Sequence, residues 1–253
     1  MQAMTKHFAL AGASKIWITG RAADALTQTQ DEVHKLVPGV KIATTTADLT
    51  SPKAVETLFE KINPEVPDIL LNNAGISLAA AHLGDTDPKL WWGDWEVNVH
   101  GFYLVARAWL RALNGRPGTL IATSSSVSDL VNPNMSSYGT SKMAVNRIVE
   151  MIQCEYGEKG VRAIALHPGG IASTGMGQNA PEQYRNRLVD TVDLAAGAAL
   201  YLATPASSFL DGRFVYSNWD FEQLEKLKDV IVEKDLLVSR INYGDILSAD
   251  VVF

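Results

Sequence analysis

The sequence predicts a single α/β domain built on a doubly wound parallel sheet, with helices on both faces of the sheet. Three observations lead to this expectation. Short apolar or β-branched runs alternate with helical stretches along most of the chain. The connections are short, and no repeat, low-complexity tract or linker divides the 253 residues. Four expected strands end in small or polar residues, as is typical of parallel sheets that carry a site at one edge.

The first half of the chain alternates helices and strands from its start. A helix over 1–11 is expected to stop at Gly12, because glycine favours helix C-termini. Ser51 and Pro52 form a helix start, since serine caps free N–H groups and proline fits the first turn. The apolar run 68–71 predicts a strand buried on both faces. The expected strands are 15–19, 40–46 and 68–71, and the expected helices are 1–11, 22–37 and 51–62.

The second half repeats the alternation. Asn114-Gly115 and Gly160 each follow a long helical stretch and are expected to end it. The expected strands are 118–123, 161–166 and 213–216, and the expected helices are 91–113, 136–159, 192–203 and 221–234. We therefore place one α/β domain over residues 1–220. Residues 221–253 form a C-terminal helix and tail, which pack on the domain or reach a partner subunit.

Composition and charge exclude several classes of function. A formal net charge of −6 leaves no basic stripe for nucleic acid or an anionic membrane. No window approaches the ~18 consecutive apolar residues of a membrane span. The lone cysteine, Cys154, has no internal partner, so a cytoplasmic location is the expectation. The five histidines share no spacing, so no metal site is expected.

The strongest chemical pattern combines Ser125, Tyr138 and Lys142. Tyr138 and Lys142 are four residues apart on an expected helix, so they share a face. An ammonium group beside a phenol favours the phenolate, and this arrangement predicts a lowered pKa for Tyr138. Ser125 follows the preceding strand and is placed to hydrogen-bond an oxygen held by the same tyrosine. A lone Tyr-x-x-x-Lys is more often a chance surface pair, so the neighbouring motifs decide its meaning.

The neighbouring motifs follow one another along the chain: Asn72-Asn73-Ala74-Gly75, Asn98-Val99-His100-Gly101, Ser125, Tyr138-Gly139-Thr140-Ser141-Lys142 and Pro168-Gly169. In kind and in spacing these motifs resemble the short-chain dehydrogenase/reductase family, over roughly residues 1–220. Asn218-Trp219-Asp220 and the charged helix after it are similar to the fungal members.

The resemblance implies a Rossmann-like fold and an NAD(P)-dependent oxidoreductase that acts on a small carbonyl or alcohol substrate. Tyr138 would exchange a proton with the substrate oxygen. Lys142 would lower the pKa of Tyr138 and hold the nicotinamide ribose. Ser125 would orient the substrate oxygen, and Asn98 would hold a water behind Lys142. The helices over 91–113 and 136–159 would pack across the interface of a homo-oligomer, a dimer or a tetramer.

The resemblance also implies which residues bind the cofactor. The family's acidic residue for the ribose 2′-hydroxyl is replaced by Gly20, and Arg21 beside it is suited to a 2′-phosphate. NADP(H) is therefore expected rather than NAD(H); the alternative is that Arg21 is a solvated loop charge. A threonine of the family corresponds to either Ser173 or Thr174. The expected cofactor-binding residues are Arg21, Asp48, Leu49, Asn72, Ala74, Gly75, Tyr138, Lys142, Pro168, Gly169 and Ile171.

One departure from the family pattern concerns its opening strand and glycine-rich phosphate loop. No Thr-Gly-x-x-x-Gly-x-Gly turn occurs in this sequence. Aligning residues 8–14 with the end of the family's first helix places Met1 at the last glycine, so the first strand and its loop are expected to be absent. That strand would lie between the strands at 15–19 and 68–71, and its absence predicts impaired cofactor binding.

Two interpretations of this departure remain. An incompletely predicted gene or a splice form of an ordinary reductase is the simpler one. A genuinely shortened member would instead perform cofactor-independent acid/base chemistry, as a lyase, isomerase or cyclase, or would act as a non-catalytic partner of a full-length relative. The tryptophans at 91, 92 and 95 are expected to serve core or subunit packing rather than to form a substrate wall.

Overall fold

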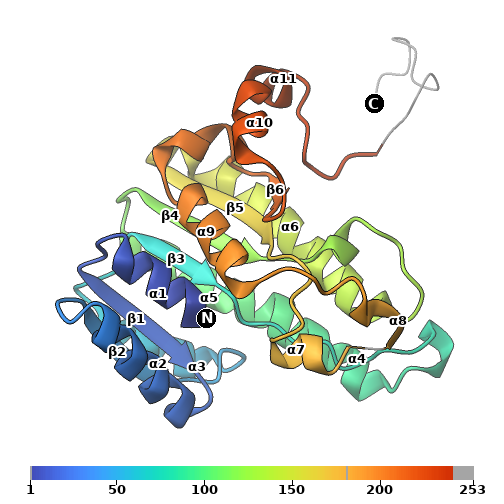
Figure 1. The fold of residues 1–253 in the computed structure, drawn as a ribbon, viewed down its shortest axis with the longest axis horizontal. Helices are drawn as coiled ribbons and strands as arrows, with labels where there is room; N and C mark the ends of the chain where they lie inside the picture. Colours follow the sequence, from blue (N-terminus) through green and yellow to red (C-terminus); the bar gives the residue numbers. More distant parts are fainter. Residues whose placement is uncertain (1, 181, 242–253) are drawn as a thin grey trace.

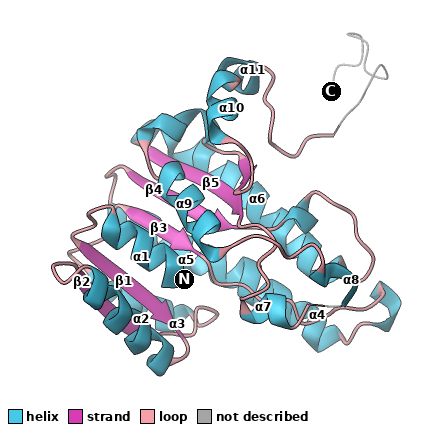
Figure 2. Ribbon diagram, viewed as in Figure 1, coloured by secondary structure: helices cyan, strands magenta, loops and turns pink. Residues whose placement is uncertain are grey.

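Two parallel sheets form the middle layer of the molecule in a computed structural model that describes residues 2–180 and 182–241 (Figures 1 and 2). One sheet has the order β1-β2 and the other β3-β4-β5-β6. All strand pairs are parallel, which confirms the expected α/β class. The strands are β1 (Lys15–Gly20), β2 (Lys41–Thr46), β3 (Ile69–Asn72), β4 (Gly118–Thr123), β5 (Val161–His167) and β6 (Phe214–Tyr216).

Helices cover both faces of the sheets, as a doubly wound fold requires. The helices α1, α2 and α9 lie on one face, and α3, α5 and α6 lie on the other (Figure 1). The long helices are α1 (Gln2–Leu10), α2 (Ala23–Leu36), α3 (Pro52–Ile62), α4 (Pro88–Trp95), α5 (Phe102–Leu113), α6 (Ser136–Tyr156) and α9 (Val192–Leu202). The short ones are α7 (Gly175–Gln178), α8 (Glu182–Arg185), α10 (Phe221–Lys226) and α11 (Lys228–Glu233).

The core divides between the two faces because strand side chains alternate. On β4, Leu120 and Ala122 pack with α5 and α6, whereas Ile121 packs with α1 and α9. Trp109 of α5 is fully buried, and its indole N–H donates to the Pro67 carbonyl oxygen at 2.8 Å. Burial on both faces explains why the central strands are nearly continuous apolar runs.

The two sheets do not pair with each other within the described residues. β1 pairs with β2, β3 pairs with β4, and β1 and β3 lie on the facing edges (Figure 1). Helix α1 spans this region: Met4 and Phe8 pack in the same apolar cluster as Ile16 of β1 and Ile69 of β3. The expectation that a further strand belongs between β1 and β3 stays a prediction.

Three helix expectations were wrong in detail. The stretch 91–113 begins at Pro88, because Asp87 caps the Lys89 and Leu90 N–H groups, and it is interrupted by a π-helical segment, η2 (Glu96–Gly101). The stretch 136–159 leaves α-geometry after Tyr156, and a 3₁₀ turn leads to left-handed Gly160. The stretch 221–234 is two short helices that meet at Leu227.

The described part of the C-terminal segment packs on the domain. Ile231 of α11 is buried, and the Phe214 N–H donates to the Leu237 carbonyl oxygen. Arg213 donates to the Leu236 carbonyl oxygen at 2.6 Å and pairs with Asp235. Residues 242–253 of the expected tail lie outside the described residues.

The close approach of α5 to β4 gives a stability prediction. A Cβ at Gly118 would lie 2.7 Å from Cζ2 of Trp109, whose indole is fully buried. Gly118→Ala is expected to lower the free energy of unfolding by about 2 kcal/mol, because overpacking forces the indole or the strand to shift. Chemical denaturation measures this loss.

Gly197→Ala is the matched control. Gly197 lies in α9 with nothing near the added Cβ, so the substitution is expected to raise stability by about 0.5–1 kcal/mol. Equal effects of the two substitutions would contradict the packing described for Gly118.

Candidate active site

The carboxyl ends of β3, β4 and β5 meet at one edge of the larger sheet. Asn72 of β3 pairs with Ala122 of β4, and Thr123 of β4 pairs with Leu166 of β5, so the carboxyl ends of the three strands are in register. The Thr123 hydroxyl donates to Asn73 Oδ1 at 3.2 Å, which ties two of these ends together. Ligands of open parallel sheets bind beyond such an edge. The structure therefore gathers three of the polar strand ends that the sequence singled out.

Asn98 lies in the π-helical segment η2 and is buried. Its Oδ1 accepts the Ile76 N–H at 2.8 Å, and its Nδ2 donates to the Ile76 carbonyl oxygen at 2.9 Å and to Ser141 Oγ at 3.0 Å. The amide thereby connects the loop after β3, the π-helix and α6. A π-helical segment redirects a side chain that regular helix geometry would point elsewhere, and such segments recur at functional sites.

Tyr138 and Lys142 lie on the buried face of α6, one turn apart. Lys142 Nζ lies 5.9 Å from the centroid of the Tyr138 ring and donates to the Thr123 carbonyl oxygen at 2.8 Å. A Cβ added at Gly75 would lie 3.0 Å from Lys142 Nζ and 3.2 Å from Asn98 Oδ1. Glycine at position 75 thus lets the loop after β3 approach both groups without displacing them.

Burial dominates the titration of this pair. Burial is the main reason that the pKa of Tyr138 is raised to about 12; a hydrogen bond with Ser125 acts to lower it, and the nearby Asp94 acts to raise it. Burial also lowers the pKa of Lys142 to about 8. The expectation that Lys142 lowers the pKa of Tyr138 was wrong for this arrangement, because desolvation of the phenol is the largest effect.

Ser125 follows β4 in an extended conformation and begins the turn η3 (Ser126–Ser128). Its side chain reaches the phenol of Tyr138, which accounts for the hydrogen bond that lowers the pKa of that group. The next amide, Ser126 N–H, donates to His167 Nδ1 at 3.1 Å. The structure therefore brings together Ser125, Tyr138, Lys142 and Asn98, the four residues named from sequence.

A second group of expected residues lies at the ends of β1 and β2. Gly20 pairs with Thr46, so Arg21 and Asp48 both follow strands that end side by side. Hydrogen bonds from Thr50 lower the pKa of Asp48, and Arg21 lowers it further. The Leu49 carbonyl would lie 3.4 Å from a Cβ at Gly101, so this loop reaches the π-helix.

The loop after β5 is held by the segment 187–190. Gly169 has φ +92°, and the Gly170 N–H donates to Asp190 Oδ2 at 2.7 Å. Ile171 is buried and forms an antiparallel bridge with Val189. This loop follows the carboxyl end of β5 and lies next to the η3 turn, which Ser125 precedes.

Ser173 and Thr174, the two candidates for the family's threonine, follow this loop. The Thr174 hydroxyl accepts the Gly177 N–H and caps α7. Ser173 is exposed.

Two polar residues at this site were missed from the sequence. Asp94 is completely buried, its Oδ1 accepts the Leu78 N–H at 2.7 Å, and burial raises its pKa. The spacing of Asp94 to Asn98, one helical turn, was the available signal. The second is His167 at the end of β5, which was considered only as one of the five histidines that share no spacing.

The residues present fit two parts of a dinucleotide cofactor. The buried cluster around Gly75, Asn98 and Lys142 has the close backbone approach and the donors that a ribose requires, and Arg21 with Asp48 lies at a separate strand end. The turn from β1 into α2, which carries Arg21, has no glycine-rich cradle for phosphate: Gly20, the last residue of β1, is the one glycine there. Residues 2–180 and 182–241 contain no cluster of His, Cys, Asp or Glu able to hold a metal ion.

Comparisons with known proteins establish the class. Residues 2–185 match the family model for short chain dehydrogenases, so the chain belongs to the short-chain dehydrogenase/reductase family and is an NAD(P)-dependent oxidoreductase of that type. Short chain dehydrogenase citE of Monascus ruber is 37% identical over 207 residues, which are 81% of this chain and 68% of that protein. Short chain dehydrogenase pigC of the same fungus is 32% identical, over 96% and 82% of the two chains.

Solved structures agree with the fold. A 7α-hydroxysteroid dehydrogenase complexed with NADH and 7-oxo glycochenodeoxycholic acid matches with a TM-score of 0.77 and 26% identity, over 85% of this chain and 87% of that one. An actinorhodin polyketide ketoreductase with NADPH matches with a TM-score of 0.76 and 19% identity, over 86% and 93%. This second likeness concerns the fold alone. No helix in the described part of the chain is long and apolar enough to cross a membrane.

The buried ammonium of Lys142 predicts a pH-dependent stability. Lys142→Met is expected to raise the free energy of unfolding at pH 7 by on the order of 2 kcal/mol, because a pKa lowered from 10.5 to about 8 means that folding buries a charge at a cost. Above pH 8 the folded wild type loses that proton while the unfolded chain keeps it. The cost, and with it the gain from the substitution, should therefore disappear as the pH rises from 8 to 10.5.

Urea denaturation of the cofactor-free protein at several pH values measures this effect. The exposed Lys61→Met is the control, with the same change in unfolding free energy expected at every pH. A stability gain for Lys142→Met that stays constant up to pH 10.5 would contradict the burial of a charged group.

Proposed function

We propose that the protein interconverts a ketone and a secondary alcohol by hydride transfer with NADP(H). The observation that carries this proposal is the convergence of Ser125, Tyr138, Lys142 and Asn98 at one sheet edge. The oxo compound in the complex of the related 7α-hydroxysteroid dehydrogenase supports a carbonyl substrate. When bound, the nicotinamide supplies or accepts the hydride.

Tyr138 is proposed as the general acid for the substrate oxygen, and as the base in the reverse direction. Its phenol is held by Ser125, whose hydroxyl is close enough to share the same oxygen. In the cofactor-free site the phenol is protonated, because burial raises its pKa to about 12, and a protonated phenol is the form needed to donate in ketone reduction. Ser125 orients the oxygen and stabilises the charge that develops on it.

Lys142 and Asn98 are proposed to hold the ribose and the proton path behind Tyr138. Lys142 has one donor committed to the Thr123 carbonyl oxygen, which leaves two of its three N–H groups for a ligand. Its pKa near 8 lets it change protonation around neutral pH. Asn98 fixes the Ile76 backbone that borders Lys142.

The cofactor preference is proposed from Arg21. Gly20 offers no carboxylate to a ribose 2′-hydroxyl, and Arg21 presents a planar fork suited to a 2′-phosphate. Asn72, Ala74 and Gly75, together with Pro168, Gly169 and Ile171, would line the dinucleotide at the exits of β3 and β5. Because the described residues include no glycine-rich cradle for the pyrophosphate, we propose that they hold NADP(H) weakly.

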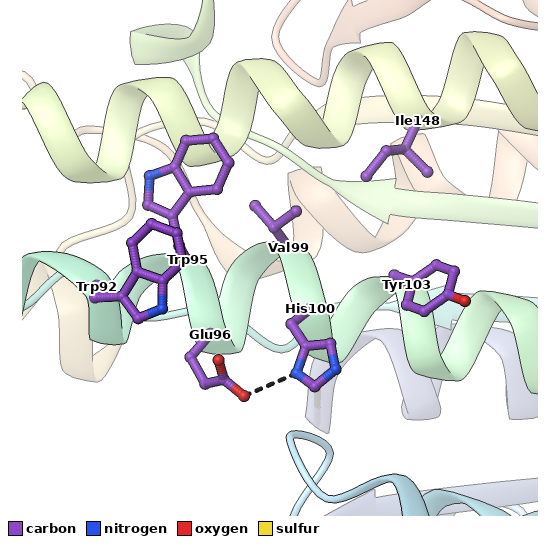
Figure 3. Close-up of a pocket in the computed structure, with 7 residues that line it drawn as sticks. All are labelled: Trp92, Trp95, Glu96, Val99, His100, Tyr103 and Ile148. Atoms are coloured by element: carbon purple, nitrogen blue, oxygen red, sulfur yellow. Dashed lines mark hydrogen bonds and ion pairs between the residues drawn. The ribbon is translucent and has the colours of Figure 1, made fainter.

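A homo-oligomer is proposed from the face formed by α4, η2, α5 and α6 (Figure 3). The near-parallel rings of Trp92 and Trp95 lie 6.1 Å apart, and Trp92 is 60% exposed beside Tyr103 at 48%. Met143 and Met151 continue this apolar surface along α6. Figure 3 shows the aromatic side chains above the Glu96–His100 pair, on the side that faces Ile148. A second copy that pairs the same face would bury it.

Replacement of the proposed acid tests the reaction. Tyr138→Phe is expected to reduce NADPH-dependent ketone reduction by about 10²–10⁴-fold, the usual contribution of a positioned proton donor. NADPH affinity, followed by nicotinamide fluorescence, should fall far less than turnover, because Lys142 is still present to hold the ribose. Tyr156→Phe, on the same helix and remote from the site, is the control. Turnover of a substrate without any nicotinamide cofactor, lost in Tyr138→Phe, would contradict hydride transfer and favour cofactor-independent acid/base chemistry.

The double variant Gly20→Asp with Arg21→Ala tests the cofactor preference. It is expected to shift the ratio of NADPH to NADH affinities toward NADH by about 10–100-fold, because the carboxylate repels a 2′-phosphate and accepts a 2′-hydroxyl. A Cβ at Gly20 meets only Leu26 at 3.6 Å, so the backbone tolerates the change. Arg111→Ala on α5 is the control; an unchanged ratio in the double variant would exclude Arg21 as the determinant.

The oligomer proposal predicts that Trp92→Arg lowers the assembly state. Sedimentation velocity should show a smaller species, since a charge placed in the centre of a self-complementary apolar face is desolvated without a partner. Leu36→Arg places the same charge on α2, where Leu36 is 53% exposed, and should leave the assembly unchanged. A wild-type monomer at micromolar concentration would refute the proposal.

A further inference from the structure

His167 is a half-buried imidazole at the end of β5 for which the proposed reaction has no use. Its Nδ1 lies 3.1 Å from the backbone nitrogen of Ser126, the residue that follows Ser125. Its ring meets the ring of Tyr216 edge-on, with centroids 4.8 Å apart and planes at 72°. The imidazole thus joins the end of β5 to the start of the η3 turn, directly after Ser125.

The geometry fixes which form of His167 is needed. A backbone N–H can only donate, so Nδ1 must present its lone pair, and the ring proton must reside on Nε2. A doubly protonated imidazole would place two donors against each other and lose the bond. Burial lowers the pKa of His167 to about 4, although Asp190 and Asp129 oppose that effect, so the neutral form persists through the physiological range.

The same turn is held at its other end by Tyr216. The Tyr216 hydroxyl lies 3.0 Å and 3.1 Å from the two carboxylate oxygens of Asp129, the residue that ends η3. Tyr216 also stacks on Trp219, with centroids 4.8 Å apart. The η3 turn is therefore clamped between the ends of β5 and β6 by two side chains, and Ser125 is the residue that leads into it.

We propose that His167 is a positioning residue for Ser125: it accepts the Ser126 amide, which fixes the backbone from which the Ser125 hydroxyl reaches Tyr138. Tyr216 and Asp129 brace the far end of the same turn. The proposal rests on the proposed function, because it assigns a purpose to the placement of Ser125 in that reaction. His167 touches neither the substrate oxygen nor the proton in this scheme.

The kinetics of ketone reduction test the proposal with two substitutions of His167, one expected to lower kcat and one expected to restore it. His167→Leu removes the acceptor and is expected to lower kcat about 10-fold, with KM and NADPH affinity nearly unchanged. His167→Asn places an amide oxygen where Nδ1 was and should restore kcat to within about threefold of wild type. His34→Leu removes another half-buried histidine, a residue of α2 that contacts the Val40 carbonyl oxygen, and should leave the kinetics unchanged.

A measurement without turnover separates this proposal from the proposed function. In protein labelled with ¹³Cζ-tyrosine, the Tyr138 resonance reports the hydrogen bond to its phenol at neutral pH. Ser125→Ala and His167→Leu should move it in the same direction, whereas His167→Asn should leave it at the wild-type position. This result supports the positioning role even if the wild type reduces no ketone, an outcome that would count against the proposed function alone.

Either of two results would overturn the role of His167. One is a Tyr138 resonance that moves in Ser125→Ala but not in His167→Leu. The other is a kcat equally low in His167→Leu and His167→Asn, since a loss that an amide acceptor cannot restore reflects packing of the ring rather than its lone pair.

Discussion

The side-chain amide of Asn98 holds together the parts of the fold on which the site depends. Through Ile76 it fixes the loop that leaves β3, and through Ser141 it fixes α6 one residue before Lys142. Asn98 and Ser141 are buried and Ile76 is half-buried, and an unmet donor or acceptor at such a place costs more than it does in water. The amide has both a donor and an acceptor available, so one side chain satisfies both backbone groups of Ile76. A carboxylate or an aliphatic side chain could not do this.

The rest of the site follows from that arrangement and carries its own cost. Lys142 is buried and donates to the Thr123 carbonyl oxygen, and burial lowers its pKa. Asp94 is buried with one oxygen, Oδ2, that lacks a hydrogen-bond partner. Packing elsewhere must offset these penalties, and the apolar layer around Trp109, Phe102 and Val149 is where the fold gains that stability. The buried polar groups of the site are thus tolerated because the apolar core beside them stabilises the fold.

The sequence predicted the strands, the parallel class and the grouping of the four residues, because those depend on local pattern and on motif spacing. It did not predict the π-helical turn at Asn98, since no propensity distinguishes η2 from the α-helices on either side. It gave the wrong direction for the Tyr138 pKa because desolvation depends on how deeply α6 is buried, which only the assembled layers determine. His167 was overlooked because its partner, the Ser126 amide, lies 41 residues away and carries no sequence signal.

The separation of the two sheets bears on how the site binds a dinucleotide. Arg21 and Asp48 belong to the β1-β2 sheet, whereas Tyr138 and Lys142 belong to the layers around β3-β4-β5-β6. Within the described residues no ladder hydrogen bonds join these sheets, so apolar contacts of α1 with α9 and of α3 with α5 relate one to the other. Apolar contacts are non-directional and tolerate small shifts that a hydrogen-bonded ladder resists. The position of Arg21 and Asp48 relative to Tyr138 and Lys142 therefore depends on this helix packing and not on strand pairing.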